Sequence, residues 1–227
     1  MPRPPGLIKV SHLAGAAIHY ARAPVADYGT RGKARRVSLM PQMADQLHKC
    51  CELLWRVCPY GPAEVVVTAG GYVNKPGMHG KGLAFDLDAI WWSMDDFDRP
   101  QPIITNAAPH DTGRYLGTEA VLRMFFGGVL DYWTNRAHHD HWHIDLREVG
   151  FRRGSKSVVG FIQAACLHVH GAAPGPLDRL WGPQTRGAVE VVLGDDADLS
   201  RMDDWVEFLR LTFERGWQCC EAVDWEG

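Results

Sequence analysis

Apolar residues recur at helical spacing in two parts of the first 150 residues. Between residues 38 and 58 they are three or four positions apart, Ser38 stands where an N-cap is expected, and a Pro-Tyr-Gly sequence follows. A second apolar stripe runs over residues 118–135, with Thr118 as its N-cap. These patterns predict two helices, one over each segment.

Three shorter segments have the features of strands. Residues 64–68 form the β-branched run EVVVT, with Gly-Pro shortly before it and Gly-Gly shortly after it. Over residues 83–90 the side chains alternate, and this places Asp86 and Asp88 on one face of a strand. Residues 141–146, HWHIDL, are expected to form a third short strand.

The remaining segments of this half are rich in residues typical of loops. Residues 1–36 are rich in Pro, Gly, Ala and Arg, and we expect an irregular lead-in segment. Residues 73–82 contain three glycines and a proline, and they are expected to form a loop. The polar stretch 95–114 predicts a long loop over a cleft.

After Gly150 the pattern changes. The sequence FRRGSK is typical of a linker, and three helical patches follow it, at 157–168, 183–193 and 203–217. We therefore expect an α+β fold, with a small antiparallel sheet and helices packed around it, followed by a small three-helix all-α domain. The predicted organisation is a lead-in segment (1–36), an α+β domain (37–150) and a helical domain (155–227).

Composition narrows the classes of partner. The chain has 227 residues, 46% of them hydrophobic and 22% charged, which is an ordinary globular balance. Its formal net charge of −3 gives no electrostatic reason to expect nucleic acid as a partner. No apolar run approaches the length needed to span a bilayer, so no membrane insertion is expected. We expect a monomer.

The cysteines do not indicate a metal site. Neighbouring cysteines such as Cys50-Cys51 cannot chelate zinc in the C-x₂-C manner. We expect free thiols that are buried or partly buried. Disulfides are the alternative if the protein works in a periplasm. The six cysteines are Cys50, Cys51, Cys58, Cys166, Cys219 and Cys220.

Histidines and a carboxylate form the candidate chemistry. His141 and His143 are two apart, and a strand would place both imidazoles on the same face. His79 lies in the glycine-rich loop, seven residues before Asp86 on the neighbouring predicted strand. Zinc accepts nitrogen and oxygen ligands of this kind, and three protein ligands leave its fourth position open, as catalytic sites require. Asp88 and Asp145 share faces with these residues and are predicted to hydrogen-bond to the histidines.

Two motifs resemble those of a known family. The sequence from His79 to Asp86, HGKGLAFD, matches H-x-x-G-x-A-x-D, the first motif of the D-Ala-D-Ala branch of the LAS zinc metallopeptidases. The sequence HWH at 141–143 is similar to their second motif, H-x-H. The surrounding histidines are similar to those of the penicillin-insensitive murein endopeptidases and of the extensin-like C-terminal family. The resemblance covers roughly residues 40–147 and implies the LAS or hedgehog-type fold.

The resemblance implies a role for each residue of the cluster. His79, Asp86 and His143 would bind one Zn²⁺ ion. His141 would lie beside the metal, where it would orient water or stabilise the oxyanion of the tetrahedral intermediate. Asp140 and His138 are competing candidates for the general base, and Asp140 is slightly favoured. A purely structural zinc site with His141 as fourth ligand is the alternative.

The chain departs from the family pattern at two positions. Gly77 stands where the family often has serine. Val73 stands where it often has an arginine that binds the substrate carboxylate. The missing arginine favours an endopeptidase over a strict carboxypeptidase, although Lys75 or Lys81 could replace it.

A second resemblance concerns the C-terminal part. Residues 158–193 resemble the three-helix peptidoglycan-binding domain, with Arg179 in place of the usual turn glycine and Val191-Val192 in place of an aromatic residue and glutamine. A helical appendage that braces the peptidase is the alternative. The matching residues are Ile162-Gln163, Asp178, the run WGPQT at 181–185 and Ala188-Val189.

Together the resemblances imply a zinc-dependent peptidoglycan endopeptidase that cuts cross-links next to D-amino acids. The alternatives are a D,D- or L,D-carboxypeptidase of the same fold, a zinc amidase that cuts the sugar–peptide junction, and a zinc-containing wall-binding protein without turnover. We expect synthesis in the cytoplasm without a Sec signal peptide and action in the periplasm or cell wall. Delivery would follow phage lysis, as for an endolysin, or use a secretion system, as for an antibacterial effector with an immunity protein as partner.

Overall fold

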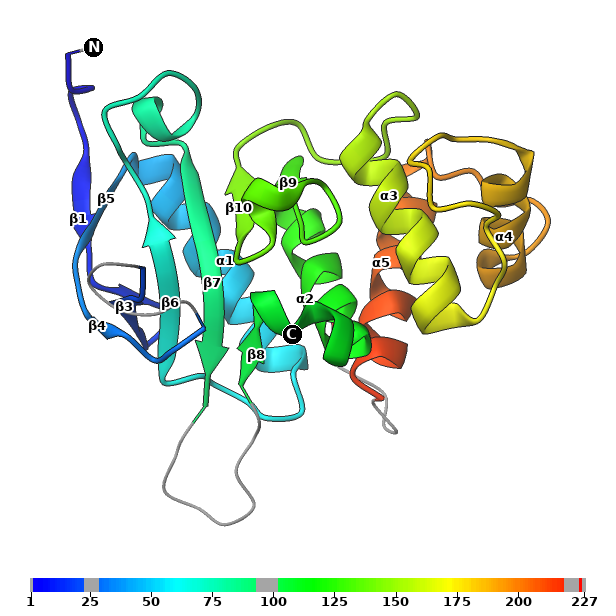
Figure 1. Ribbon diagram of the computed structural model, residues 1–227, viewed down its shortest axis with the longest axis horizontal. Coiled ribbons are helices and arrows are strands. Elements are labelled where there is room, and N and C mark those ends of the chain that lie inside the picture. Colours follow the sequence, from blue (N-terminus) through cyan, green and yellow to red (C-terminus); the bar gives the residue numbers. More distant parts are fainter. Residues whose placement is uncertain (1, 23–28, 93–101, 219–224, 226–227) are drawn as a thin grey trace.

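The computed structural model describes residues 2–22, 29–92, 102–218 and 225 of the chain. These residues form an α+β fold with an eight-stranded mixed sheet, a two-stranded sheet and five α-helices (Figure 1). The strands are β1 (Ile8–Val10), β2 (His12–Leu13), β3 (Ala16–Tyr20), β4 (Lys33–Ala34), β5 (Val37–Leu39), β6 (Val65–Gly70), β7 (Ala84–Trp91), β8 (Ile103–Ile104), β9 (Gly128–Leu130) and β10 (Trp142–Asp145). The α-helices are α1 (Pro41–Val57), α2 (Thr112–Phe125), α3 (Lys156–Ala165), α4 (Pro183–Leu193) and α5 (Met202–Gly216).

The main sheet is mixed, whereas the sequence predicted an antiparallel sheet. Its strands follow the order β2-β3-β6-β7-β10-β9, with β4 beside β3 and β8 beside β7. β6, β7 and β10 pair antiparallel, but β3 pairs parallel with β6. The chain between β3 and β6 contains α1, and a helical crossover is the usual way to connect parallel neighbours.

The parallel strand comes from the segment predicted to be irregular. Within residues 1–36 the described part of the chain contains four strands, of which β3 lies inside the main sheet. Ala16 and Ile18 on β3 are buried and face the core. The strands are only two to five residues long and are separated by turns, so the Pro- and Gly-rich composition conceals them.

The two predicted helices of this half exist, with different starts. α1 begins at Pro41, and Ser38 pairs with Lys9 in the small sheet instead of capping the helix. α2 begins at Thr112, six residues before the predicted N-cap Thr118, which is fully buried inside it.

The predicted second helix is also too long. α2 ends at Phe125, and the following residues turn into the short strand β9, which pairs with β10. Gly127 and Gly128 favour this ending, because glycine is unfavourable in a helix. Cross-strand pairing with β10 is a tertiary contact that the local pattern did not indicate.

The predicted loop over 95–114 contains ordered elements. Residues 93–101 lie outside the described part of the chain. From residue 102 onward the chain forms β8, a 3₁₀ helix (Thr105–His110) and the start of α2.

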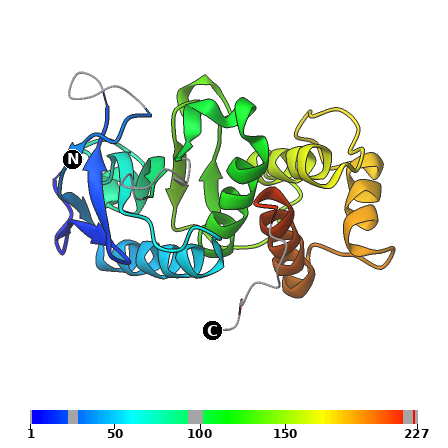
Figure 2. The ribbon, with the colours of Figure 1, turned by 90° about the horizontal axis from the view of Figure 1, so that it is seen from below.

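The C-terminal helices pack against the α+β part through α2. Figure 2 shows α5 beside α2, and glycines on both helices allow this close approach. A Cβ on Gly216 would overlap the carbonyl oxygen of Gly113. One hydrophobic core includes Leu122 of α2, Phe161 of α3 and Phe213 of α5. The predicted boundary near residue 155 lies in the loop before α3, but the core continues across it, and the division into two domains stays a prediction.

The cysteines of the described chain are buried thiols that form no disulfide with one another. They are Cys50, Cys51, Cys58 and Cys166. Burial raises the pKa of the Cys51 thiol to about 12. Cys219 and Cys220 lie outside the described residues. Within the described chain, no helix has both the length and the apolar character that a membrane span requires.

Candidate metal centre

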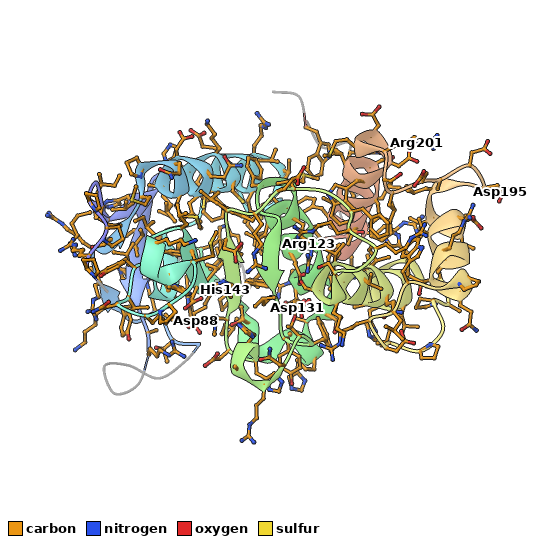
Figure 3. The ribbon with its side chains drawn as sticks, turned by 90° about the horizontal axis from the view of Figure 1, so that it is seen from above. Asp88, Arg123, Asp131, His143, Asp195 and Arg201 are labelled. Carbon is orange, nitrogen blue, oxygen red and sulfur yellow. The ribbon has the colours of Figure 1, made fainter. Side chains whose placement is uncertain are left out.

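Three separate segments bring the candidate ligands together. His79 lies in a 3₁₀ turn (His79–Lys81) and Asp86 on β7. His143 lies on β10 and is labelled in Figure 3. In the antiparallel pairing of these strands, His143 is directly opposite Asp86. Directly opposed residues point to the same face of a sheet, so the register accounts for the contact. The 3₁₀ turn before β7 places the His79 side chain next to both Asp86 and His143.

The three ligand atoms form a small triangle. His79 Nε2 lies 3.0 Å from Asp86 Oδ1 and 3.0 Å from His143 Nδ1. His143 Nδ1 lies 3.0 Å from Asp86 Oδ1. Ligand atoms around a tetrahedral zinc ion are about 3.3 Å apart, so a metal ion fits this triangle with little adjustment.

The other nitrogen of each histidine is held by an acceptor. His79 Nδ1 donates to the carbonyl oxygen of Gly71 at 2.6 Å, and His143 Nε2 donates to Asp145 Oδ2 at 3.3 Å. When the rings are neutral, these contacts favour the tautomers in which His79 Nε2 and His143 Nδ1 carry lone pairs. Two lone pairs and a carboxylate oxygen then converge, which is stable only with a cation or a proton between them.

The pKa shifts of Asp86 and His143 also indicate that the site favours a positive charge. Burial alone would raise the pKa of Asp86, but hydrogen bonds from His143 and His79 outweigh it and lower the pKa well below the ordinary value. Burial would lower the pKa of His143, but hydrogen bonds to Asp145 and Asp86 raise it to about 9. Without a metal, the cluster therefore holds a proton at the position that a cation would fill.

Among the described residues, the group that could hold a metal ion consists of His79, Asp86 and His143. These are the three ligands that the sequence predicted. His141 lies close by, with its Nε2 3.6 Å from Asp86 Oδ1, but it is not part of the group.

Asp140 and His141 form a second pair beside the triangle. Asp140 Oδ1 lies 2.7 Å from His141 Nδ1. This contact assigns the proton to Nδ1 and leaves the lone pair on Nε2, which faces the Asp86 side of the cleft. His141 is buried, and it is His141 rather than Asp140 that lines the cleft.

His138 stands on the far side of His141. Its ring centroid is 5.2 Å from that of His141 and 5.9 Å from that of His143. His138 Nδ1 lies 2.9 Å from Asn135 Oδ1. Burial, together with the neighbouring His141 and His143, lowers the pKa of His138 to about 4, so it is neutral at neutral pH.

The two predicted supporting carboxylates differ in position. Asp145 accepts from His143 as expected. Asp88 is fully buried and accepts from the backbone N–H of Gly29 at 3.1 Å instead of contacting a histidine among the described residues. Burial raises the pKa of Asp88 to about 7.

Several supporting residues were missed by the sequence pattern. The carbonyl of Gly71 and the side chain of Asn135 each fix a histidine, and neither motif includes them. Gly128 lies opposite Asp145 on β9, where any Cβ would overlap the Asp145 carboxylate. The Gly127-Gly128 pair was the available signal, because paired glycines at a helix end often mark a close approach.

A cleft of about 420 Å³ lies over the ligands. The cleft is open to solvent. The described residues that line it are Arg22, Lys75, Pro76, Gly77, Met78, His79, Asp86, Leu130, Ala137, His138, His141, His143 and Arg147.

Comparison with known proteins gives no assignment. No family model matches the chain, and no curated protein or solved structure matches it. The function is therefore argued from the site itself.

Proposed function

We propose that this protein is a zinc-dependent peptidase that cuts peptide cross-links in peptidoglycan, with one Zn²⁺ held by His79, Asp86 and His143. The observation that carries the proposal is the triangle of ligand atoms with 3.0 Å edges at the floor of an open cleft. The observed α+β fold with a mixed sheet is compatible with this proposal.

Zinc is the metal that suits these ligands best. Two imidazole nitrogens and one carboxylate oxygen form a common ligand set of catalytic zinc sites. Three protein ligands leave one position for water or substrate, unlike a closed structural site. A bound zinc ion would polarise a peptide carbonyl and lower the pKa of water.

The neighbouring residues supply the proton chemistry. Asp140 holds the Nδ1–H of His141, so His141 presents its Nε2 to the cleft as an acceptor. A carboxylate that orients a histidine is a frequent arrangement for general-base catalysis. In this proposal Asp140 acts through His141, and the pair takes a proton from the attacking water and returns it to the leaving amine. His138 is neutral and lines the same cleft, where it would hydrogen-bond to the oxyanion or to the substrate.

The C-terminal helices are proposed to attach the protein to the cell wall. The residues that carry the resemblance there contact one another. Gln163 Nε2 donates to Asp178 Oδ1 at 3.0 Å and to Thr185 Oγ1 at 3.1 Å. Gln163 is buried, so this part of the motif maintains the turn between α3 and α4. Arg179, in place of the usual glycine, has a positive φ of 62°, the conformation that glycine adopts most easily.

A cavity in this region offers a place for a ligand. Its volume is about 260 Å³, and its lining includes Phe151, Trp181, Arg153 and Asp195. The ring centroids of Phe151 and Trp181 are 4.7 Å apart. Aromatic and charged side chains in one cavity suit a polar ligand with apolar faces, such as a wall fragment.

The test is digestion of purified sacculi, followed by muropeptide analysis. Samples are the zinc-loaded wild type, the chelator-treated protein, His79→Ala and Asp140→Ala, with the exposed His12→Ala as matched control. Metal content of each sample is measured by mass spectrometry. We expect one zinc per chain, conversion of cross-linked dimers to monomers by wild type and His12→Ala, and loss of this conversion in the other three samples.

Other products would change the assignment. Removal of a terminal D-amino acid without loss of cross-links indicates a carboxypeptidase, and release of peptide from sugar indicates an amidase. Zinc-loaded protein that binds sacculi and leaves them unchanged is a wall-binding protein without turnover. That last result rejects the proposed activity.

A further inference from the structure

Positive charge reaches the metal cleft from three elements. Arg22 follows β3, Lys75 lies in the loop after β6, and Arg147 follows β10. Among the described residues that line the cleft, Asp86 is the only one with a carboxylate. A divalent cation on the proposed ligands would neutralise Asp86 and leave the cleft positive. Such a cleft favours an anionic substrate.

Arg147 is held in a defined position beside the ligands. Its Nη2 lies 3.2 Å from Asp145 Oδ2, the same carboxylate oxygen that accepts from His143. The side chain is 52% exposed, so the guanidinium retains access to the cleft. A guanidinium has five donors in a planar fork, and a single contact with Asp145 leaves enough of them to bind a second carboxylate.

Lys75 lines the same cleft from the loop between β6 and the 3₁₀ turn at His79–Lys81. It is exposed and lies beside Pro76, Gly77 and Met78, which also line the cleft. Lys81, six residues further along, is exposed but does not line it. Arg22 lies near the buried carboxyl of Asp88, and its positive charge favours the ionised form of that group. Among the described residues that line the cleft, Lys75 and Arg147 are therefore the cations best placed to bind a ligand.

We propose that Arg147 and Lys75 determine specificity by binding a free carboxylate on the amino acid that supplies the scissile nitrogen. This inference rests on the proposed peptidase function and names its substrate class. Val73, where the resemblance predicts an arginine for this purpose, does not line the cleft. The positive charge comes instead from other elements of the fold.

Two sources in the cell wall present this chemistry. A stem peptide ends in a D-alanine with a free α-carboxylate. In a cross-link to diaminopimelate, the amino acid that supplies the amide nitrogen also carries a free carboxylate. The test therefore uses two peptide pairs, each with the carboxylate free or amidated, so that the source is distinguished.

Hydrolysis of the four peptides is measured for wild type, Lys75→Gln, Arg147→Gln and Arg147→Lys. Lys81→Gln and the exposed Arg136→Gln are matched controls. We expect wild type to prefer one free acid over its amide by about tenfold or more in kcat/KM, the size of a charge-assisted hydrogen bond. Lys75→Gln and Arg147→Gln are expected to reduce this ratio, because they raise KM for the acid more than they change hydrolysis of the amide. Arg147→Lys should keep part of the preference, and the two controls all of it.

Failure of this inference is distinguishable from failure of the proposed function. If the peptides are cut without preference for the acid, or if the variants lose acid and amide hydrolysis equally, the carboxylate site is rejected and the peptidase stands. If no peptide is cut, the peptidase function is rejected. Calorimetric binding of the same peptide pairs to the zinc-loaded protein then tests whether the cleft binds a free carboxylate. Binding that prefers the acid and loses that preference in Arg147→Gln supports the carboxylate site, whereas equal binding rejects it.

Discussion

At the scale of single residues, the candidate metal site depends on side chains other than the three candidate ligands. His143 is oriented by Asp145, and Asp145 fits only because the opposite residue, Gly128, has no side chain. Such supporting contacts fix the tautomer and direction of a ligand, and their loss commonly weakens metal binding.

Gly128→Ala is expected to weaken zinc binding by about tenfold or more. The new methyl group would overlap the Asp145 carboxylate and displace the acceptor of His143 Nε2. The affinity is measured by competition with a chromophoric chelator. Gly154→Ala, whose Cβ meets nothing within 4 Å, is the control and should bind as wild type does. Unchanged affinity in Gly128→Ala would show that Asp145 does not orient the ligand.

His170, which lies outside the candidate metal centre, predicts a pH dependence of the free energy of unfolding. Its Nε2 donates to Thr212 Oγ1 at 2.9 Å, and its Nδ1 is buried without a hydrogen-bond partner among the described residues. Burial, with a smaller effect of Arg215, lowers the pKa of His170 to about 4. Between pH ~6.5 and ~4 the unfolded chain binds a proton that native His170 does not, so stability falls as pH falls through this window.

The expected contribution is about 2 kcal/mol after allowance for partial exposure. Urea unfolding at pH 7 and pH 4.5 measures it in wild type, His170→Leu and the exposed-site control His12→Leu. Wild type and His12→Leu should lose about 2 kcal/mol more on acidification than His170→Leu. Equal losses in all three would mean that His170 is protonated in the folded protein.

At the scale of elements, the contact between α2 and α5 joins the two parts of the chain. Gly113 and Gly117 on α2 meet Gly216 on α5, where the backbones approach closely. Without side chains between them, the helices bury the apolar residues on either side, among them Phe213 and Trp217.

Gly216→Ala is expected to destabilise the protein by about 2 kcal/mol, although alanine is the better helix former. Its methyl group would overlap the carbonyl of Gly113 and approach the Gly117 Cα to 3.2 Å, so the helices must separate. Gly187→Ala in α4 has open space and should be neutral or stabilising by up to about 1 kcal/mol. Thermal unfolding measures the stability of both variants relative to wild type. A Gly216→Ala variant that is more stable than wild type would contradict the close packing of α2 and α5.

At the scale of the whole molecule, a buried ionic network connects β10, which carries the candidate ligand His143, with the C-terminal helices. Trp142, between His141 and His143 on β10, donates to Glu119 Oε2 at 3.3 Å. Arg123 Nε donates to Glu119 Oε1 at 2.8 Å, and its Nη2 reaches the Ser157 carbonyl in α3 at 3.2 Å. Figure 3 shows Arg123 in the middle of the molecule, between the metal site and the C-terminal helices.

Removal of the C-terminal helices is therefore expected to unfold the remainder. A fragment of residues 1–150 would expose the apolar face of α2 and leave Arg123 without its hydrogen bonds to Ser157. Loss of a hydrogen bond to a charged group costs about 1.5–3 kcal/mol, in addition to the lost apolar burial. Circular dichroism should show no cooperative melting of the fragment, and the zinc affinity should be lost. A fragment that melts cooperatively and binds zinc as the full chain does would support the two independent domains that the sequence predicted.

The sequence by itself determined the local features of the site. The pattern around His79 and Asp86, the H-x-H of the third strand and their resemblance to a known family together predicted the three candidate ligands that the fold brings close to one another. Alternation with period two places side chains on a common face, and this depends only on local backbone geometry. Helical periodicity likewise located α1 and the three C-terminal helices, because each buries one continuous stripe.

Tertiary structure decided what depends on distant neighbours. The parallel position of β3, the end of α2 at Phe125 and the register that sets His143 opposite Asp86 all arise from pairing between strands far apart in sequence. The same holds for Arg147, which follows β10 and lines the cleft together with residues from distant segments. A residue's local pattern carries its own preference for helix or strand, but the partner that it meets depends on how the whole chain closes around its core.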